Sequence, residues 1–115
     1  MTENELITAL QQRPEQIEFA DALAVIDAAY DFIPTAFSNG GLENAAGQNN
    51  GSCKIFAFGQ LHQLTPDQAL ACFGEHYRSV LADLSGESHQ NIRHFMQHGW
   101  AAIDYEGQPL TLKKR

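Results

Sequence analysis

The stretch from residue 38 to residue 52 most strongly limits what this chain can fold into. It holds four Gly, four Asn and two Ser in fifteen positions, and these residues favour turns and backbone at positive φ. Neither a helix nor a strand is expected within it. The run that follows, CKIFAF at 53–58, carries apolar groups on both of its alternating faces, which predicts a strand covered on both sides.

Helical signals precede this stretch. Thr2 and Glu5 fit a capping box, which predicts a short first helix that Pro14 interrupts. Apolar residues then recur at intervals of three and four positions up to Tyr30, which predicts a second, longer helix from Pro14. Pro34 ends that pattern, because the residue before a proline is disfavoured in helical geometry.

A second set of elements follows residue 60. Thr65 and Gln68 form another capping box, which predicts a helix that continues until Gly86 stops it. The remaining pattern predicts three more elements, namely a short helix that Ser88 caps and Gly99 ends, a strand over 100–105 and an edge strand around Leu110 and Leu112.

Helices in two clusters, with strands between and after them, predict an α+β protein rather than an alternating α/β one. The expected architecture is a small antiparallel sheet packed against about four helices. A length of 115 residues fits one domain that includes the whole of 1–115.

The composition argues against several classes of partner. A formal charge of -7 disfavours nucleic acid, because binding the phosphate backbone requires many cations. The basic residues at 113–115 are interpreted as a solvated tail. No stretch has the length of a membrane span and the N-terminus lacks the apolar core of a secretory signal, so we expect a soluble, cytoplasmic protein without a membrane partner.

Three patterns that can indicate catalysis or metal binding are set aside. The segment 47–54 superficially resembles a phosphate-binding P-loop, but its glycine spacing is one residue short and a strand is expected after it. His94 and His98 are four residues apart, without a third ligand, and are interpreted as a solvated pair rather than a metal site. Cys53 and Cys72 are expected to be buried, inert thiols. No catalytic residue and no cofactor are therefore assigned.

The candidate site is polar. His89 and Arg93 are neighbours on a predicted helix. Arg93 either offers its planar fork to an anion, or bridges to a carboxylate or to the carbonyl groups of the 38–52 loop and holds that loop against the sheet. The asparagines of that loop either help its backbone to bind an anion or satisfy its own turns. The candidate binding residues are Asn39, Asn44, Asn49, Lys54, His89 and Arg93.

Three separated motifs resemble the HopJ family, whose members are described as type III effectors. They are FSNGGLENAAGQNNGSCKIFAFG, ACFGEHYRSVL and HQNIRHFMQHGW, in this order, and the resemblance extends from about Phe19 to about Leu112. It implies a shared fold, but it supplies no enzymatic activity, cofactor or catalytic residue. The effector description implies delivery into a host cell by a type III secretion apparatus.

Two function classes follow from these observations. The first is a non-enzymatic domain that binds a protein or a small anionic ligand. The second is a small enzyme with a polar cleft formed by the 38–52 loop, His89 and Arg93. The absence of a recognisable nucleophile, metal-ligand set or acid pair favours the first class, whereas a pocket shared by these polar residues would favour the second.

Overall fold

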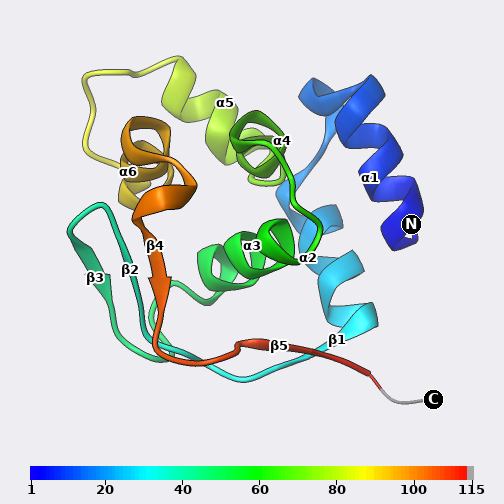
Figure 1. Cartoon of the computed structure of the whole chain (residues 1–115). Coiled ribbons are helices and arrows are strands. Elements are labelled where there is room, and N and C mark those ends of the chain that lie inside the picture. Colours follow the sequence, from blue (N-terminus) through cyan, green and yellow to red (C-terminus); the bar gives the residue numbers. More distant parts are fainter. Residues whose placement is uncertain (114–115) are drawn as a thin grey trace.

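The computed structural model describes residues 1–113 and shows helices packed around one central helix, with short strands along one side (Figure 1). This confirms the α+β class. The helices within these residues are α1 (Glu3–Gln12), α2 (Phe19–Ala29), α3 (Asn50–Leu61), α4 (Pro66–Ala71), α5 (Glu75–Leu81) and α6 (Gln90–His98), with 3₁₀ turns η1 (Pro14–Gln16) and η2 (Trp100–Ala102). The strands are β1 (Tyr30–Phe32), β2 (Phe37–Asn39), β3 (Leu42–Asn44), β4 (Ile103–Tyr105) and β5 (Leu110–Leu112).

The strands of the described chain form two small antiparallel sheets rather than one. β1 pairs with β5, with Asp31 opposite Thr111. β2 lies between β3 and β4, with Ser38 opposite both Glu43 and Asp104. The predicted strand around Leu110 is confirmed, and it pairs only with β1.

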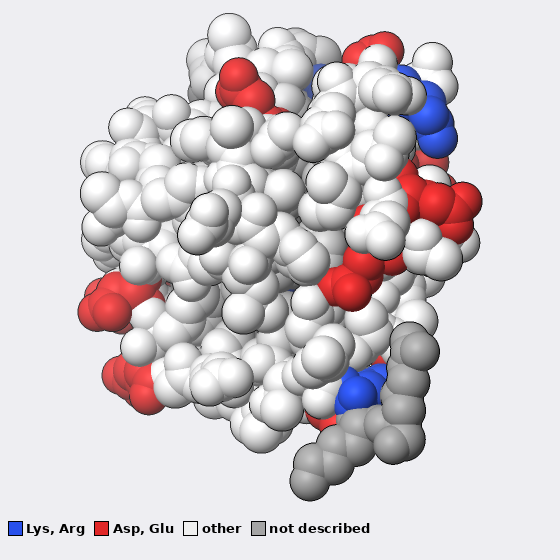
Figure 2. All heavy atoms as spheres, turned by 45° about the vertical axis from the view of Figure 1, so that its right-hand side comes forward, with Lys and Arg blue, Asp and Glu red and all other residues white. Residues whose placement is uncertain are grey.

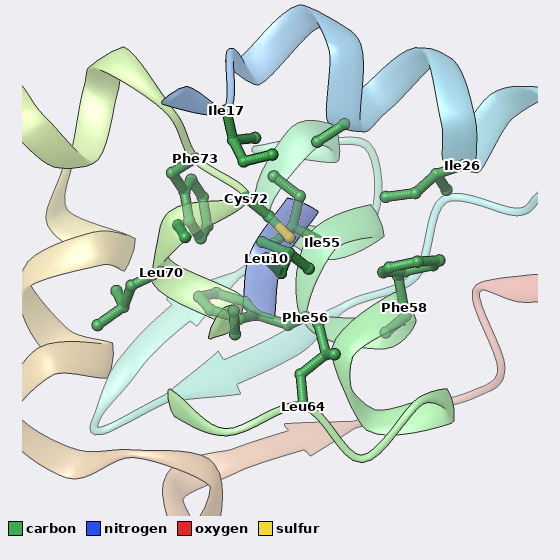
Figure 3. Close-up of a cluster of buried hydrophobic side chains, with 14 of the residues drawn as sticks. Leu10, Ile17, Ile26, Ile55, Phe56, Phe58, Leu64, Leu70, Cys72 and Phe73 are labelled. Atoms are coloured by element: carbon green, nitrogen blue, oxygen red, sulfur yellow. The ribbon is translucent and has the colours of Figure 1, made fainter. Parts of the chain in front are cut away.

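The predicted strand at 53–58 is wrong, because these residues form the middle of α3. This helix occupies the centre of the molecule (Figure 1), and Ile55, Phe56 and Phe58 are fully buried. Figure 3 shows side chains from several elements gathered around Phe56. A fully buried element has apolar residues on every side, so its sequence shows no alternation of apolar and polar positions. A buried helix and a buried strand therefore have similar sequences.

The prediction that 38–52 contains neither a helix nor a strand is also wrong. β2 and β3 form a hairpin whose two turn residues, Gly40 and Gly41, have φ of 60° and 89°. Two residues at positive φ suit the tight hairpin turns that match the twist of the strands. Residues 45–49 then lead into α3, which begins at Asn50.

The helix predicted between residues 66 and 84 is divided at Gly74. Its capping box at Thr65 is confirmed, but Gly74 has a φ of 56°, and a Cβ there would lie 2.4 Å from the backbone nitrogen of Phe19. The close approach of the two chain segments therefore requires glycine. This contact brings the start of α2 beside α5.

Smaller differences occur at the ends of predicted elements. The capping box at Thr2 is confirmed. The helix predicted from Pro14 is a 3₁₀ turn followed by α2, and Tyr30 already belongs to β1. His89, not Ser88, precedes α6, and the first half of the strand predicted at 100–105 is the turn η2.

The surface carries few basic groups. On the face shown in Figure 2, acidic side chains form separate small groups and the basic side chains of the described residues form no patch. The predicted solvated tail includes residues 114 and 115, which lie outside the described part of the chain. Within residues 1–113, no helix combines the length and apolar character that a membrane crossing needs.

Candidate functional site

A pocket of about 490 Å³ lies where the β2–β3 hairpin meets the beginnings of α3 and α6. This volume is within the range of small-ligand pockets, about 300–1,000 Å³. The hairpin contributes one wall and the two helix N-termini contribute another. The lining residues are Leu42, Glu43 and Asn44 of β3, Gln48 to Ser52 except Asn50, His89 to Ile92 around the start of α6, and Phe19, Phe73 and His76.

The N-termini of α3 and α6 have no side-chain cap. Their N-cap residues, Asn49 and His89, adopt left-handed backbone with φ of 55° and 53°, whereas N-cap residues usually have extended backbone. Within residues 1–113, the first three backbone N–H groups of each helix have no hydrogen-bond acceptor. Such N–H groups attract anions, because they are unpaired donors at the positive end of the helix dipole.

The side chain of each N-cap residue is used elsewhere. Asn49 donates from Nδ2 to Oδ1 of Asn44 at 2.7 Å, and the His89 ring lies 4.9 Å from the His76 ring between centroids. Left-handed backbone costs about 1–2 kcal/mol for most non-glycine residues, and less for Asn, whose side chain can hydrogen-bond locally. The chain thus accepts strain at both positions, a pattern that occurs most often at binding and catalytic sites.

A network of buried asparagines joins the hairpin to α6. Oδ1 of Asn91 accepts from Nδ2 of Asn39 at 3.1 Å and from Nδ2 of Asn44 at 3.2 Å. In return, Nδ2 of Asn91 donates to Oδ1 of Asn44 at 2.9 Å. All three side chains are buried, so this network fixes the hairpin wall of the pocket relative to the start of α6.

Asn39 lies behind the pocket rather than in its lining. Its Nδ2 also donates to the backbone oxygen of Asn91 at 2.9 Å, but its Oδ1 has no hydrogen-bond partner among the described residues. Among the predicted site residues, Asn44, Asn49 and His89 line the pocket, whereas Asn39 supports it through Asn91.

Aromatic rings form a further part of the pocket lining. The Phe19 ring stacks on Phe73 with centroids 6.2 Å apart and meets His76 edge-on at 4.7 Å. The carboxylate of Glu75 accepts the backbone N–H of Phe19 at 2.8 Å, which fixes the start of α2. Burial, followed by the nearby His76 ring and the Arg93 cation, lowers the pKa of His89. The charged form of His89 is therefore less favourable in the folded protein than in the unfolded chain.

Lys54 lies outside the pocket. Its Nζ forms an ion pair with Asp27 at 2.8 Å and lies 4.9 Å from the centre of the Phe32 ring. Both partners belong to the α2–β1 segment, so Lys54 joins α3 to that segment.

Arg93 also points away from the pocket, and the prediction that it holds the 38–52 loop is wrong. Its Nη1 donates to the backbone oxygens of Asp83 and Leu84 at 2.9 Å and 3.2 Å, and its Nε donates to the oxygen of Ser88. The guanidinium therefore stabilises the connection between α5 and α6.

The two histidines set aside as metal ligands and the two cysteines set aside as nucleophiles lie outside the pocket lining. Nδ1 of His94 lies 3.2 Å from the backbone oxygen of Gly40. The His98 side chain is exposed. No group of three or more His, Cys, Asp or Glu that could hold a metal ion occurs within residues 1–113. Cys53 and Cys72 are buried free thiols, and burial raises the pKa of Cys72 to about 12.

Sequence reasoning missed Asn91, His76 and Phe19 as pocket residues. Asn91 precedes Phe95 by four positions, so helical spacing places it on the buried side of α6, and a buried asparagine needs partners. His76 follows Phe73 by three positions, so the spacing of the predicted helix places it beside that buried ring. Phe19 had none, because only the close contact of its backbone with Gly74 brings it to α5.

Comparisons with known proteins agree with this fold. A crystal structure described as the unknown function protein VPA0580 aligns with a TM-score of 0.95 at 50% sequence identity, covering 98% of this chain and 95% of that chain. No curated protein matches the sequence. The family model described as HopJ type III effector protein matches residues 3–110. Because this match includes most of the sequence, the chain belongs to the HopJ type III effector family.

Proposed function

We propose that this protein is a non-enzymatic domain that binds a small anion in the pocket between the N-termini of α3 and α6. The observation that carries the proposal is the pair of uncapped helix N-termini on one cavity. Each helix end is equivalent to about half a positive charge, so the two ends together offer an anion roughly one unit of compensating charge. Delivery by a type III secretion apparatus, which the effector description implies, stays a prediction for this chain.

The caps of other helices support this interpretation. α1 and α4 begin with full capping boxes at Thr2 and Thr65, so these two helices satisfy their N-termini with their own side chains, whereas α5, which follows Gly74, has no side-chain cap. At α2 the carboxylate of Glu75 accepts the first N–H group. An external anion at α3 and α6 would have the role that these side chains have at the other helices.

A small enzyme remains the second candidate because two histidines line the pocket. His76 and His89 are the titratable rings there, and an uncharged imidazole can act as a general base. Neither buried cysteine lines the pocket, and Arg93 is engaged elsewhere. The binding function is preferred because the geometry offers a place for an anion but no activated nucleophile beside it.

An NMR titration with acetate and with inorganic phosphate tests the proposal. We expect the largest amide shifts at Gly51, Ser52, Asn91 and Ile92, because their N–H groups face the binding position. The variant Ser52→Glu places a carboxylate at the third position of α3, where it can cap the helix. We expect it to weaken anion binding by at least about tenfold, while raising the stability by about 0.5 kcal/mol.

Gln97→Glu is the matched control, since it adds the same charge on the exposed far end of α6. It should leave anion binding unchanged. Amide shifts spread evenly over the surface, or equal binding in Ser52→Glu and the native protein, would contradict the proposed function.

A further inference from the structure

The pocket has a second feature, a continuous wall of rings. Phe73, Phe19, His76 and His89 all line it, and neighbouring centroids along this series lie 6.2, 4.7 and 4.9 Å apart. Phe19 and His76 are half-buried and His89 is exposed, so part of the wall is open to a ligand. Aromatic walls favour ligands with a flat apolar or unsaturated part, which can stack on the rings or meet them edge-on.

The ring wall directly adjoins the unpaired N–H groups of α3. A Cβ added to Gly51, the second residue of α3, would lie 2.8 Å from Cζ of Phe19. The Phe19 ring therefore rests on the first turn of α3, and it does so because position 51 has no side chain. A ligand that uses both features must carry its charged group close to its ring.

The charge of the lining favours a singly charged group. The lining contains no Lys or Arg, and it includes Glu43. Within the lining, compensation for a negative charge comes only from helix N–H groups and from the rings of His76 and His89. This arrangement suits a carboxylate better than a phosphate monoester, which carries nearly two charges at neutral pH.

The polar side of the pocket can recognise substituents on a ring. Side-chain amides of Gln48, Asn49 and Gln90 line the cavity beside the two helix N-termini. Each amide already makes one hydrogen bond, in which Oε1 of Gln48 accepts from Ala45, Nδ2 of Asn49 donates to Asn44 and Nε2 of Gln90 donates to Glu87. The other end of each amide, Nε2 of Gln48, Oδ1 of Asn49 and Oε1 of Gln90, is left for a ligand. Hydroxyl or amino groups on a bound ring would find partners there.

We infer that the ligand is a small aromatic carboxylate, an acid whose carboxylate is attached to or near a flat ring. This inference rests on the proposed function and adds the class of the anion. The carboxylate would lie at the first turn of α3, with its ring against Phe19 and His76 and its substituents toward the amides.

Titrations with benzoate, acetate and benzyl alcohol separate the two parts of the inference. Benzoate has the ring and the charge, acetate has the charge alone, and benzyl alcohol has the ring alone. We expect benzoate to bind about tenfold more tightly than either of the others, as one favourable aromatic contact allows. Its amide shifts should include Gly51 and Ser52, and the ring protons of Phe19 and His76 should shift with them.

The variant Phe19→Leu removes the ring but keeps an apolar side chain. Its benzoate affinity should fall to that of acetate, while its acetate affinity stays unchanged. Phe32→Leu, a half-buried ring on β1 outside the pocket lining, is the control and should bind benzoate as the native protein does. If Phe19→Leu does not fold, the ratio of the benzoate affinity to the acetate affinity in the native protein decides whether the ring of the ligand contributes to binding.

The possible results separate this inference from the proposed function. Equal affinity for acetate and benzoate, with shifts at Gly51 and Ser52, would overturn the aromatic class and leave anion binding intact. No shift at these amides with any anion would overturn both. Equal affinity for benzyl alcohol and benzoate would overturn the role of the carboxylate.

Discussion

Replacing Asn91 tests whether the buried asparagine network holds the pocket together. Asn91→Ala removes three side-chain hydrogen bonds, two accepted by its Oδ1 from Asn39 and Asn44 and one donated by its Nδ2 to Asn44. A buried hydrogen bond contributes about 1 kcal/mol net, and a buried group left without a partner costs about 1–3 kcal/mol. Three bonds at about 1 kcal/mol each, and one group left without a partner at up to about 3 kcal/mol, give an upper estimate of about 6 kcal/mol for the loss of unfolding free energy.

Remaining partners reduce this estimate. Nδ2 of Asn39 keeps its bond to the backbone oxygen of Asn91, and Oδ1 of Asn44 keeps the bond from Asn49. Nδ2 of Asn44 has only long contacts to the oxygens of Phe37 and Leu42, at 3.5 and 3.4 Å. We therefore expect a loss of about 2–3 kcal/mol, and a decrease in Tm of about 10 °C for a domain of this size.

Urea unfolding followed by circular dichroism measures this loss, and amide exchange locates it. The exchange should become faster in β2 and β3 and at the start of α6, because the network joins these elements. Asn4→Ala is a matched control. Asn4 is the second residue of α1, as Asn91 is of α6, but it is exposed, so its replacement should change stability by less than about 0.5 kcal/mol.

The reasoning would be refuted if Asn91→Ala behaved like Asn4→Ala. It would also be refuted if the stability fell as expected while exchange in the hairpin stayed unchanged, because the loss would then originate elsewhere. A double-mutant cycle with Asn44→Ala gives a further check. Residues in one buried network should show a coupling energy of about 0.5–3 kcal/mol.

Two further predictions concern Arg93 and His89. Arg93→Ala should cost about 1 kcal/mol and speed amide exchange over residues 82–89, where its carbonyl partners lie; faster exchange over 38–52 instead would contradict the assignment. Because the pKa of His89 is lower in the folded protein than its ordinary value near 6.5, stability should decrease as the pH falls below about 6.5. Thermal unfolding of the native protein and His89→Gln between pH 5 and 8 measures this, and the variant should show the smaller pH dependence. Equal pH dependence in both proteins would assign the effect to another group.

The sequence predicts best the features that depend on neighbouring residues. Both capping boxes form as expected, at Thr2 and at Thr65, because all of their atoms lie within one helical turn. The Gly40–Gly41 turn carried an equally local signal, since two glycines between short strands favour a hairpin. The high Gly and Asn content of residues 38–52 favoured an irregular loop instead, so the hairpin was not predicted.

Features that depend on distant residues could not be predicted in this way. Gly59, which directly follows the strand predicted at 53–58, lies inside α3, where a Cβ would come 2.6 Å from the Trp100 ring. Nothing near position 59 in the sequence indicates that contact. Likewise, Arg93 and His89 are neighbours on the same helix, yet one turns toward the α5–α6 connection and the other toward the pocket.

The choice of N-cap residues at α3 and α6 is itself an argument that the pocket has a function. Extended backbone with Ser, Thr or Asp at positions 49 and 89 would cap both helices and stabilise each by about 1 kcal/mol. The chain instead has Asn and His in left-handed backbone at these positions, which adds strain and leaves donors unpaired. α1 and α4 show that ordinary caps are compatible with this fold. Two such departures from a stable arrangement on the same cavity are explained if the unpaired N–H groups serve a ligand.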